Sequence, residues 1–240
     1  MKKQGTMSDH NTPQWLREVL RRGFKPKKIY HLPNDALYGF VAANSGTVSV
    51  FDKKLYALEG LPGAGKTSLA ILLTRGNKRM GRVPQILPTE PANDQAMGQA
   101  YYFRSEELKT RAIMRSPKKE FVLDRYYPST LAFYWAYDRV KSATMYQTAL
   151  RWYRRALVKK LIIKPWRVFY IDLSVNVSSR RKERVPARTS PNMWLNVNFL
   201  RRFRQYYVEV FPKLEPQTEI ITLPGTEKME ALEAMIRNKL

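Results

Sequence analysis

The sequence contains no cysteine, few acidic residues and no long apolar segment. Without cysteine the chain forms no disulfide, binds no metal through thiolates and has no cysteine nucleophile, which suits a reducing compartment. No stretch approaches the roughly 20 apolar residues that span a bilayer, and the N-terminal MKKQGTMSDHNTPQW lacks the apolar core of a signal peptide. We therefore expect a soluble, cytoplasmic protein that does not associate with a membrane.

Acidic residues are outnumbered by basic ones, 20 Asp and Glu against 43 Lys and Arg, giving a net charge of +23. This excess is unusual for an enzyme of small metabolites and favours a polyanionic partner. The basic clusters are spread along the whole chain, and solvated helix faces would produce the same pattern. No RNA- or DNA-reading motif is present, so nucleic acid is predicted only as a secondary, salt-sensitive partner.

With 240 residues, 44% of them hydrophobic, the chain is long enough to bury a substantial core. Short apolar runs alternate with helical patterns, an order that predicts an α/β fold with a mainly parallel sheet of five strands and helices on both faces. The runs are Leu55–Glu59, Gln85–Glu90, Glu120–Asp124, Arg167–Asp172 and Glu219–Leu223. Three of them end in an acidic residue, and ligands bind at the carboxyl ends of such strands.

The chain divides at residue 54 into an N-terminal extension, 1–54, and a domain, 55–240. In the extension, the residue pattern predicts a short helix at Pro13–Arg22 and a hairpin in which Ala36–Val41 pairs with Thr47–Phe51. Within the domain, three helical zones are predicted, and the aromatic residues of the first are expected to pack in the core. The zones are Ser129–Leu161, Asn192–Val210 (ending before Pro212) and Glu227–Lys239.

Residues 60–67 read GLPGAGKT, a full match to the phosphate-binding loop G-x-x-x-x-G-K-[ST] between an expected strand and an expected helix. Its glycines let successive backbone N–H groups turn toward phosphates at the N-terminus of the helix. Lys66 is expected to reach the outer phosphates of ATP, and Thr67 to offer its hydroxyl to Mg²⁺. The predicted phosphate-binding residues are Gly60, Pro62, Gly63, Ala64, Gly65, Lys66, Thr67 and Ser68.

Residues 122–134, VLDRYYPSTLAFY, closely resemble the D-R-[YFH]-x-x-S-x-x-A-Y segment of thymidylate kinases and related nucleoside and nucleotide kinases. The resemblance implies that Asp124 holds Mg²⁺ through water and that Arg125 clamps a phosphate of the acceptor or the group in transfer. An Asp124 that only caps the following helix would leave the same pattern.

Two further segments follow in the order of these kinases. Thr89-Glu90-Pro91 lies where thymidylate kinases have R-E-P and deoxynucleoside kinases have E-P, so the missing Arg leaves Glu90 free to act as the base for a sugar hydroxyl. Residues 101–111 resemble the acceptor-binding helix, with Phe103 and Arg104, or Tyr102 and Arg111, as the aromatic and the cation. Alternatively, Glu90 is an ordinary loop residue, and the charges of residues 101–111 face solvent on an ordinary amphipathic helix.

Residues 178–188, SSRRKERVPAR, resemble the arginine-rich lid that closes over the phosphates in the same kinases. Arg180, Arg184 and Arg188 recur every four residues and would share one side of a helix, as they also would on a solvated basic helix. The resemblance covers 55–240 and implies the three-layer P-loop kinase fold. It also implies the homodimer common among thymidylate kinases.

The leading hypothesis is an ATP- and Mg²⁺-dependent phosphotransferase acting on a nucleoside monophosphate, with Lys66, Asp124, Arg125, Arg180 and Arg184 as catalytic residues. A nucleoside kinase with Glu90 as base is the runner-up. In a third hypothesis the loop binds nucleotide without catalysis, and the protein is a basic component associated with nucleic acid.

Overall fold

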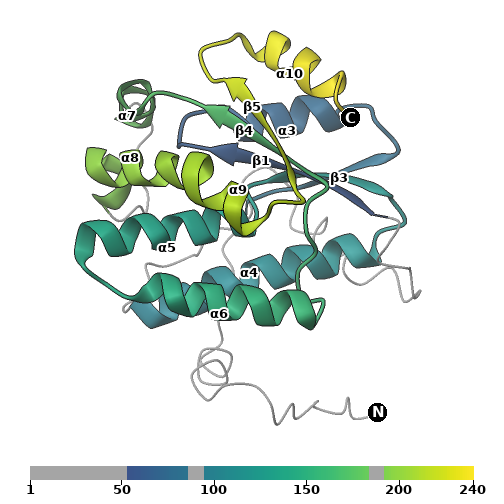
Figure 1. Ribbon diagram of the computed structural model, residues 1–240. Coiled ribbons are helices and arrows are strands. Elements are labelled where there is room, and N and C mark those ends of the chain that lie inside the picture. The colour runs from purple at the N-terminus through teal and green to yellow at the C-terminus, as the bar shows by residue number, and fades with distance from the viewer. Residues whose placement is uncertain (1–52, 86–94, 184–191) are drawn as a thin grey trace, which may run out of the picture.

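The computed structural model describes residues 53–85, 95–183 and 192–240, and these residues form a layered α/β domain built on a five-stranded sheet (Figure 1). The strands are β1 (Lys54–Gly60), β2 (Met80–Val83), β3 (Glu120–Asp124), β4 (Arg167–Asp172) and β5 (Glu219–Pro224). Their order is β2-β3-β1-β4-β5, and every pair is parallel. The predicted α/β class, parallel sheet and strand number are confirmed.

Helices cover both faces of this sheet because the central strands have apolar side chains on both sides. In β1, Leu55 and Ala57 face one hydrophobic cluster, while Tyr56 and Leu58 face the other. The first cluster is covered by α4 (Gln95–Arg115), α5 (Tyr127–Lys141), α6 (Met145–Val158), α8 (Val197–Gln205) and α9 (Phe211–Leu214). The second is covered by α3 (Lys66–Thr74) and α10 (Met229–Arg237) (Figure 1). This is the three-layer arrangement predicted above.

The second strand lies earlier in the chain than the sequence pattern indicates. β2 ends at Val83, and its register with β3 pairs Met80 with Glu120. Pro84 follows directly, and because proline has no N–H it cannot continue the ladder. The predicted strand at Gln85–Glu90 is therefore wrong at Gln85, which is not in a strand, and its remaining residues lie outside the described ranges, as do the predicted helix and hairpin of the N-terminal extension.

The helical zone 129–161 is two helices rather than one. α5 ends at Lys141, its C-cap residue Ser142 has a left-handed backbone with φ 50°, and α6 begins at Met145. The carboxylate of Asp138 accepts hydrogen bonds from the backbone N–H groups of Met145 and Tyr146, at 2.9 and 2.8 Å. The start of α6 is thus fixed by a side chain of α5. The aromatic residues of both helices pack in or against the first cluster, as expected.

The zone 192–210 is also interrupted. A 3₁₀ turn, η2 (Asn192–Leu195), precedes α8, and a π-helical turn, η3 (Tyr206–Val210), links α8 to α9. Pro212 is in the first turn of α9, where its missing N–H breaks no intrahelical bond. The prediction that the helix stops before Pro212 is therefore wrong, because α9 follows η3 directly and continues through the proline to Leu214.

Candidate active site

The loop between β1 and α3 contains the residues predicted to bind phosphate, and its conformation depends on three glycines. Gly60, Gly63 and Gly65 all have positive φ angles, of 134°, 74° and 84°. A Cβ on Gly60 would lie 2.5 Å from the carbonyl oxygen of Ile171 in β4, so glycine is required there by contact as well as by backbone angle. Pro62 and Ala64 complete the loop, and Ser68 follows in the first turn of α3.

Lys66 is folded back onto this loop. Its side chain is buried, and its Nζ donates to the carbonyl oxygens of Gly60 at 3.0 Å and Leu61 at 2.7 Å. Burial lowers the pKa of Lys66 well below its usual value, and the nearby charge of Arg125 acts in the same direction, against Asp124 and Glu59. A polyanionic ligand beside the amine would favour its charged form.

Thr67 and Asp124 are joined across the sheet edge. The hydroxyl of Thr67, at the start of α3, donates to Oδ2 of Asp124, at the carboxyl end of β3, over 2.5 Å. A hydroxyl and a carboxylate beside a phosphate loop are a donor set that suits Mg²⁺, which uses few protein oxygens together with phosphates and water. Within the described ranges no group of three or more His, Asp or Glu side chains forms a denser metal site.

Arg125 follows Asp124 with a left-handed backbone, φ 61°, which is uncommon for a side chain of this size. Its guanidinium donates to Oγ of Ser129 at 2.9 Å and lies 5.5 and 5.7 Å from the ring centres of Trp194 and Phe203. It is held between a hydroxyl and two aromatic faces, so its orientation is fixed by the fold.

Glu59 anchors this arrangement, and sequence reasoning did not single it out. It is fully buried in β1 and accepts hydrogen bonds from the backbone N–H of Tyr126 at 2.9 Å, from the hydroxyl of Tyr207 at 2.8 Å and from Ser129. Burial raises the pKa of Glu59, and the charge of Arg125 opposes this rise. The only available signal was its position directly before Gly60, at the end of a buried strand.

One side of α4 faces Arg125. Lys109 donates to the carbonyl oxygen of Arg125 at 3.0 Å and to both carboxylate oxygens of Glu106, at 3.1 and 3.2 Å. Burial is the main cause that raises the pKa of Glu106 to about 7. Tyr102 is two turns before Lys109 on the same side, and Arg125 partly offsets the rise that burial causes in its pKa.

The other predicted acceptor residues of α4 lie away from Arg125. Phe103 is buried and stacks on Trp152 of α6, with ring centres 4.3 Å apart. Arg104 pairs with Glu107 at 3.3 Å, and Arg111 is exposed. The structure therefore brings Tyr102, rather than Phe103, Arg104 or Arg111, toward the carboxyl end of β3.

The helix α7 (Val175–Glu183) lies over the phosphate loop. Ser178 donates to the carbonyl oxygen of Pro62 at 2.8 Å, and Arg181 donates to that of Gly63 at 3.0 Å. Arg180 is exposed, and among the described residues it bonds only within its own helix, to the carbonyl oxygen of Asn176. The contact of Arg181 was missed because the four-residue spacing pointed to Arg180 instead. Glu90, Arg184 and Arg188 lie outside the described residues.

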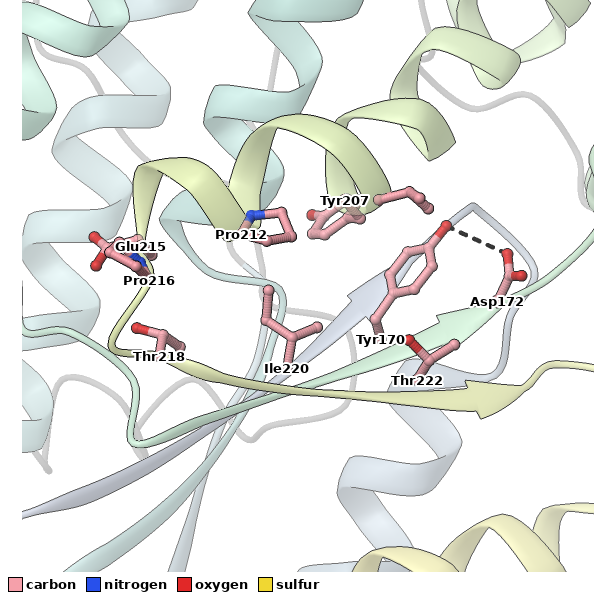
Figure 2. Close-up of a pocket in the computed structure, with 10 residues that line it drawn as sticks. Tyr170, Asp172, Tyr207, Pro212, Glu215, Pro216, Thr218, Ile220 and Thr222 are labelled. Carbon is pink, nitrogen blue, oxygen red and sulfur yellow. Dashed lines mark hydrogen bonds between the residues drawn. The ribbon is translucent and has the colours of Figure 1, made fainter.

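A separate groove runs along the edge of the sheet between β5 and the η3–α9 segment (Figure 2). It encloses about 390 Å³ and is lined by Tyr170, Asp172, Tyr207, Val208, Pro212, Glu215, Pro216, Thr218, Ile220 and Thr222. Asp172 ends β4 and forms a two-bond ion pair with Arg204, at 2.6 and 2.7 Å. The carboxylate of Asp172 is thus held by Arg204, whereas that of Asp124 contacts Thr67 directly after the loop, so Asp124 is the acidic strand end assigned to the candidate site.

Comparison with solved structures identifies the fold. The chain is similar to deoxyadenosine kinase from M. mycoides with bound dCTP (TM-score 0.58, 15% identity, 77% of this chain and 97% of that chain). It is also similar to thymidylate kinase from Candida albicans (TM-score 0.52, 14% identity, 78% of this chain and 91% of that chain). No protein-family description matches the chain, and no curated protein matches it. At these identities the likeness is one of fold, and that fold is the one found in nucleoside and nucleotide kinases.

Proposed function

We propose that the protein is an ATP- and Mg²⁺-dependent kinase that transfers a phosphoryl group to a nucleoside. This proposal rests on one observation: Lys66, the Thr67–Asp124 pair and Arg125 lie close together at one edge of the sheet. Phosphoryl transfer is catalysed chiefly by positioning and by cations along the developing charge, and these residues supply both. In this proposal Lys66 binds the outer phosphates of ATP, and Thr67 and Asp124 hold Mg²⁺.

A nucleoside is favoured over a nucleoside monophosphate by the surroundings of Arg125. A phosphorylated acceptor needs cationic clamps, whereas an alcohol acceptor needs a base. In the described part of α4, Lys109 contacts the backbone of Arg125 but is already paired with Glu106. Tyr102 faces Arg125, but Arg104 and Arg111 do not. The order of the two acceptors predicted from the sequence is thus reversed, and Glu90 is proposed as the base. A solved structure of the M. mycoides deoxyadenosine kinase holds dCMP as a product.

A nucleoside monophosphate, as in thymidylate kinases, is the second candidate. It is supported by the D-R-Y-x-x-S segment, which places Ser129 and Arg125 in hydrogen-bond contact at 2.9 Å, and by the similarity in fold to the Candida albicans enzyme. In that case Arg125 would bind the phosphate of the acceptor.

The test is ADP release from Mg²⁺·ATP with a panel of nucleosides and nucleoside monophosphates. We expect turnover only with an acceptor, faster with a nucleoside, and none with Lys66→Ala. Glu90→Gln should reduce turnover of a nucleoside at least a hundredfold if Glu90 is the base, which is within the usual range for general bases. Little loss in Glu90→Gln, with a monophosphate as the better acceptor, would select the second candidate.

A non-catalytic role predicts a different result. If the loop only binds nucleotide, Mg²⁺·ATP will raise the melting temperature of the protein, while no acceptor in the panel will release ADP. Lys66→Ala should then abolish the stabilisation by ATP without changing the melting temperature of the free protein greatly. That outcome would overturn the proposed kinase activity and leave the nucleotide site in place.

A further inference from the structure

The helices α4 and α6 lie side by side on the outside of the first hydrophobic cluster (Figure 1). Gln99 donates to the carbonyl oxygen of Met145 at 2.8 Å, and further along both helices Trp152 donates to Glu107 at 3.3 Å. Because the contacts advance in the same order, the two helices run in the same direction. Their adjoining solvent sides form one continuous surface.

This surface carries two rows of cations. Arg151 and Arg155 of α6 and its C-cap residue Lys159 are exposed and recur every four residues, which places them in a line about 12 Å long. On α4, Arg104 and Arg111 share the solvent side next to α6, because both lie close in helical angle to Glu107, which contacts Trp152. We refer to these five residues as the α4–α6 basic surface.

Few carboxylates balance these charges. From Arg139 to Ile171 the chain has nine Lys or Arg and no Asp or Glu. Arg151, Arg155 and Lys159 form no ion pair with any carboxylate of the described residues, and Arg104 alone is paired, with Glu107. Burial lowers the pKa of Arg111, and the charge of Arg104 adds to this effect. Like charges are therefore crowded on this surface.

We propose that the α4–α6 basic surface binds the phosphate backbone of a nucleic acid, independently of the kinase site. Two parallel rows of mostly arginine side chains suit a linear polyanion, and guanidinium groups pair well with phosphate oxygens. A second copy of the chain would bring like charges together at this surface. A membrane is disfavoured because the apolar side of α6, with Ala149, Tyr153 and Ala156, is already buried and cannot insert.

Binding of a fluorescent 20-nucleotide single strand and of a 20-base-pair duplex, measured by anisotropy between 50 and 200 mM NaCl, tests this proposal. Arg151→Gln/Arg155→Gln/Lys159→Gln should weaken binding at least tenfold at the lowest salt. For the single strand it should also reduce the slope of log affinity against log salt by about 2, since each phosphate contact contributes about 0.7. None of these three residues belongs to the proposed active site, so ATP binding and melting temperature should not change.

The matched control removes the same charge elsewhere. Arg75, Lys78 and Arg79 are exposed in the turn after α3, and changing all three to Gln lowers the net charge equally. Equal weakening by both triple variants would mean that only net charge matters and would overturn the proposal. Absence of binding to either nucleic acid, or preferential retention on anionic phosphatidylserine vesicles, would also overturn it. None of these results depends on whether kinase turnover is found.

Discussion

The backbone of Arg125 has a left-handed conformation, with φ 61°, and makes one hydrogen bond on each side of its Cα. Its N–H donates to the carbonyl oxygen of Leu58 at 3.2 Å, and its carbonyl oxygen accepts from Lys109 at 3.0 Å. An L-residue in this region carries strain of about 1–2 kcal/mol, which glycine does not. The contacts with β1 and α4 therefore stabilise this backbone conformation, and the backbone conformation in turn sets the direction of the guanidinium.

Comparison of Arg125→Gly with Arg125→Ala isolates this strain, because both variants lose the same contacts with Ser129, Trp194 and Phe203. The entropy of glycine in the unfolded chain offsets about 0.4–1 kcal/mol of the relief. We expect the glycine variant to be more stable by up to about 1.6 kcal/mol in urea unfolding, and both variants to lack turnover. An alanine variant more stable than the glycine variant by about 0.4–1 kcal/mol would show that the backbone at this position is unstrained.

The buried carboxyl of Glu106 predicts a dependence of stability on pH. Burial raises the pKa of Glu106 from 4.5, its value in the unfolded chain, to about 7 in the folded protein. Between pH 4.5 and pH 7 the folded state therefore binds more protons than the unfolded state. The contribution of Glu106 to stability therefore falls as pH rises from 4.5 to 7, by about 3 kcal/mol at most.

Glu106→Gln removes this titration. We expect the free energy of unfolding of the wild type, relative to this variant, to decrease steadily between pH 5 and pH 7 in urea titrations. Glu215→Gln should behave in the same way, since burial also raises the pKa of Glu215 to about 7. A difference between wild type and Glu106→Gln that stays constant over this range would contradict the assignment.

At the residue scale, the site could be predicted where its members are contiguous in sequence. Lys66 and Thr67 belong to one motif, Asp124 and Arg125 to another, and the parallel register of β1 with β3 brings the two motifs together. Glu59 and Ser129 could not be assigned, because their roles depend on a hydrogen bond between residues 70 positions apart. No local pattern encodes such a contact.

At the scale of elements, α7 is joined to the phosphate loop through Ser178 and Arg181. Since Arg181 bonds to the loop itself, Arg181→Ala should weaken ATP binding about tenfold, a loss of about 1.4 kcal/mol, with a smaller effect on the maximal rate. Arg180→Ala should do the reverse if Arg180 acts in the transition state, as the proposed lid requires. Steady-state kinetics with varied ATP separates these effects, and equal behaviour of the two variants would contradict the distinction.

Apart from β2, the strands were easier to predict than the helix ends. β3 and β4 occur at the predicted residues because a buried parallel strand is a short apolar run that can be read directly from sequence. The break between α5 and α6 and the continuation of helix through Pro212 were missed. The start of α6 is fixed by Asp138, and a π-helical turn connects α8 to α9. Neither feature follows from the local residue pattern.

At the scale of the whole molecule, both hydrophobic clusters are built around the same five strands. β1 lies at the centre, and its side chains contribute to each cluster. Among the described residues, the first cluster begins at Leu55 and the second at Tyr56, both in β1. The residues that join at the candidate site also come from this sheet and the helices that cover it. The core and the site thus form one structural unit.

We therefore expect a fragment of residues 53–240 to fold without residues 1–52. Its core is large enough to be stable alone, so urea unfolding should be cooperative and its midpoint should be close to that of the full chain. ATP should stabilise the fragment and the full chain equally, because the phosphate loop and Asp124 are retained. Near-ultraviolet circular dichroism of the packed aromatic residues checks the fold. A fragment that lost this signal while keeping helical far-ultraviolet dichroism would show that the boundary is misplaced, since the elements would form without fixed packing.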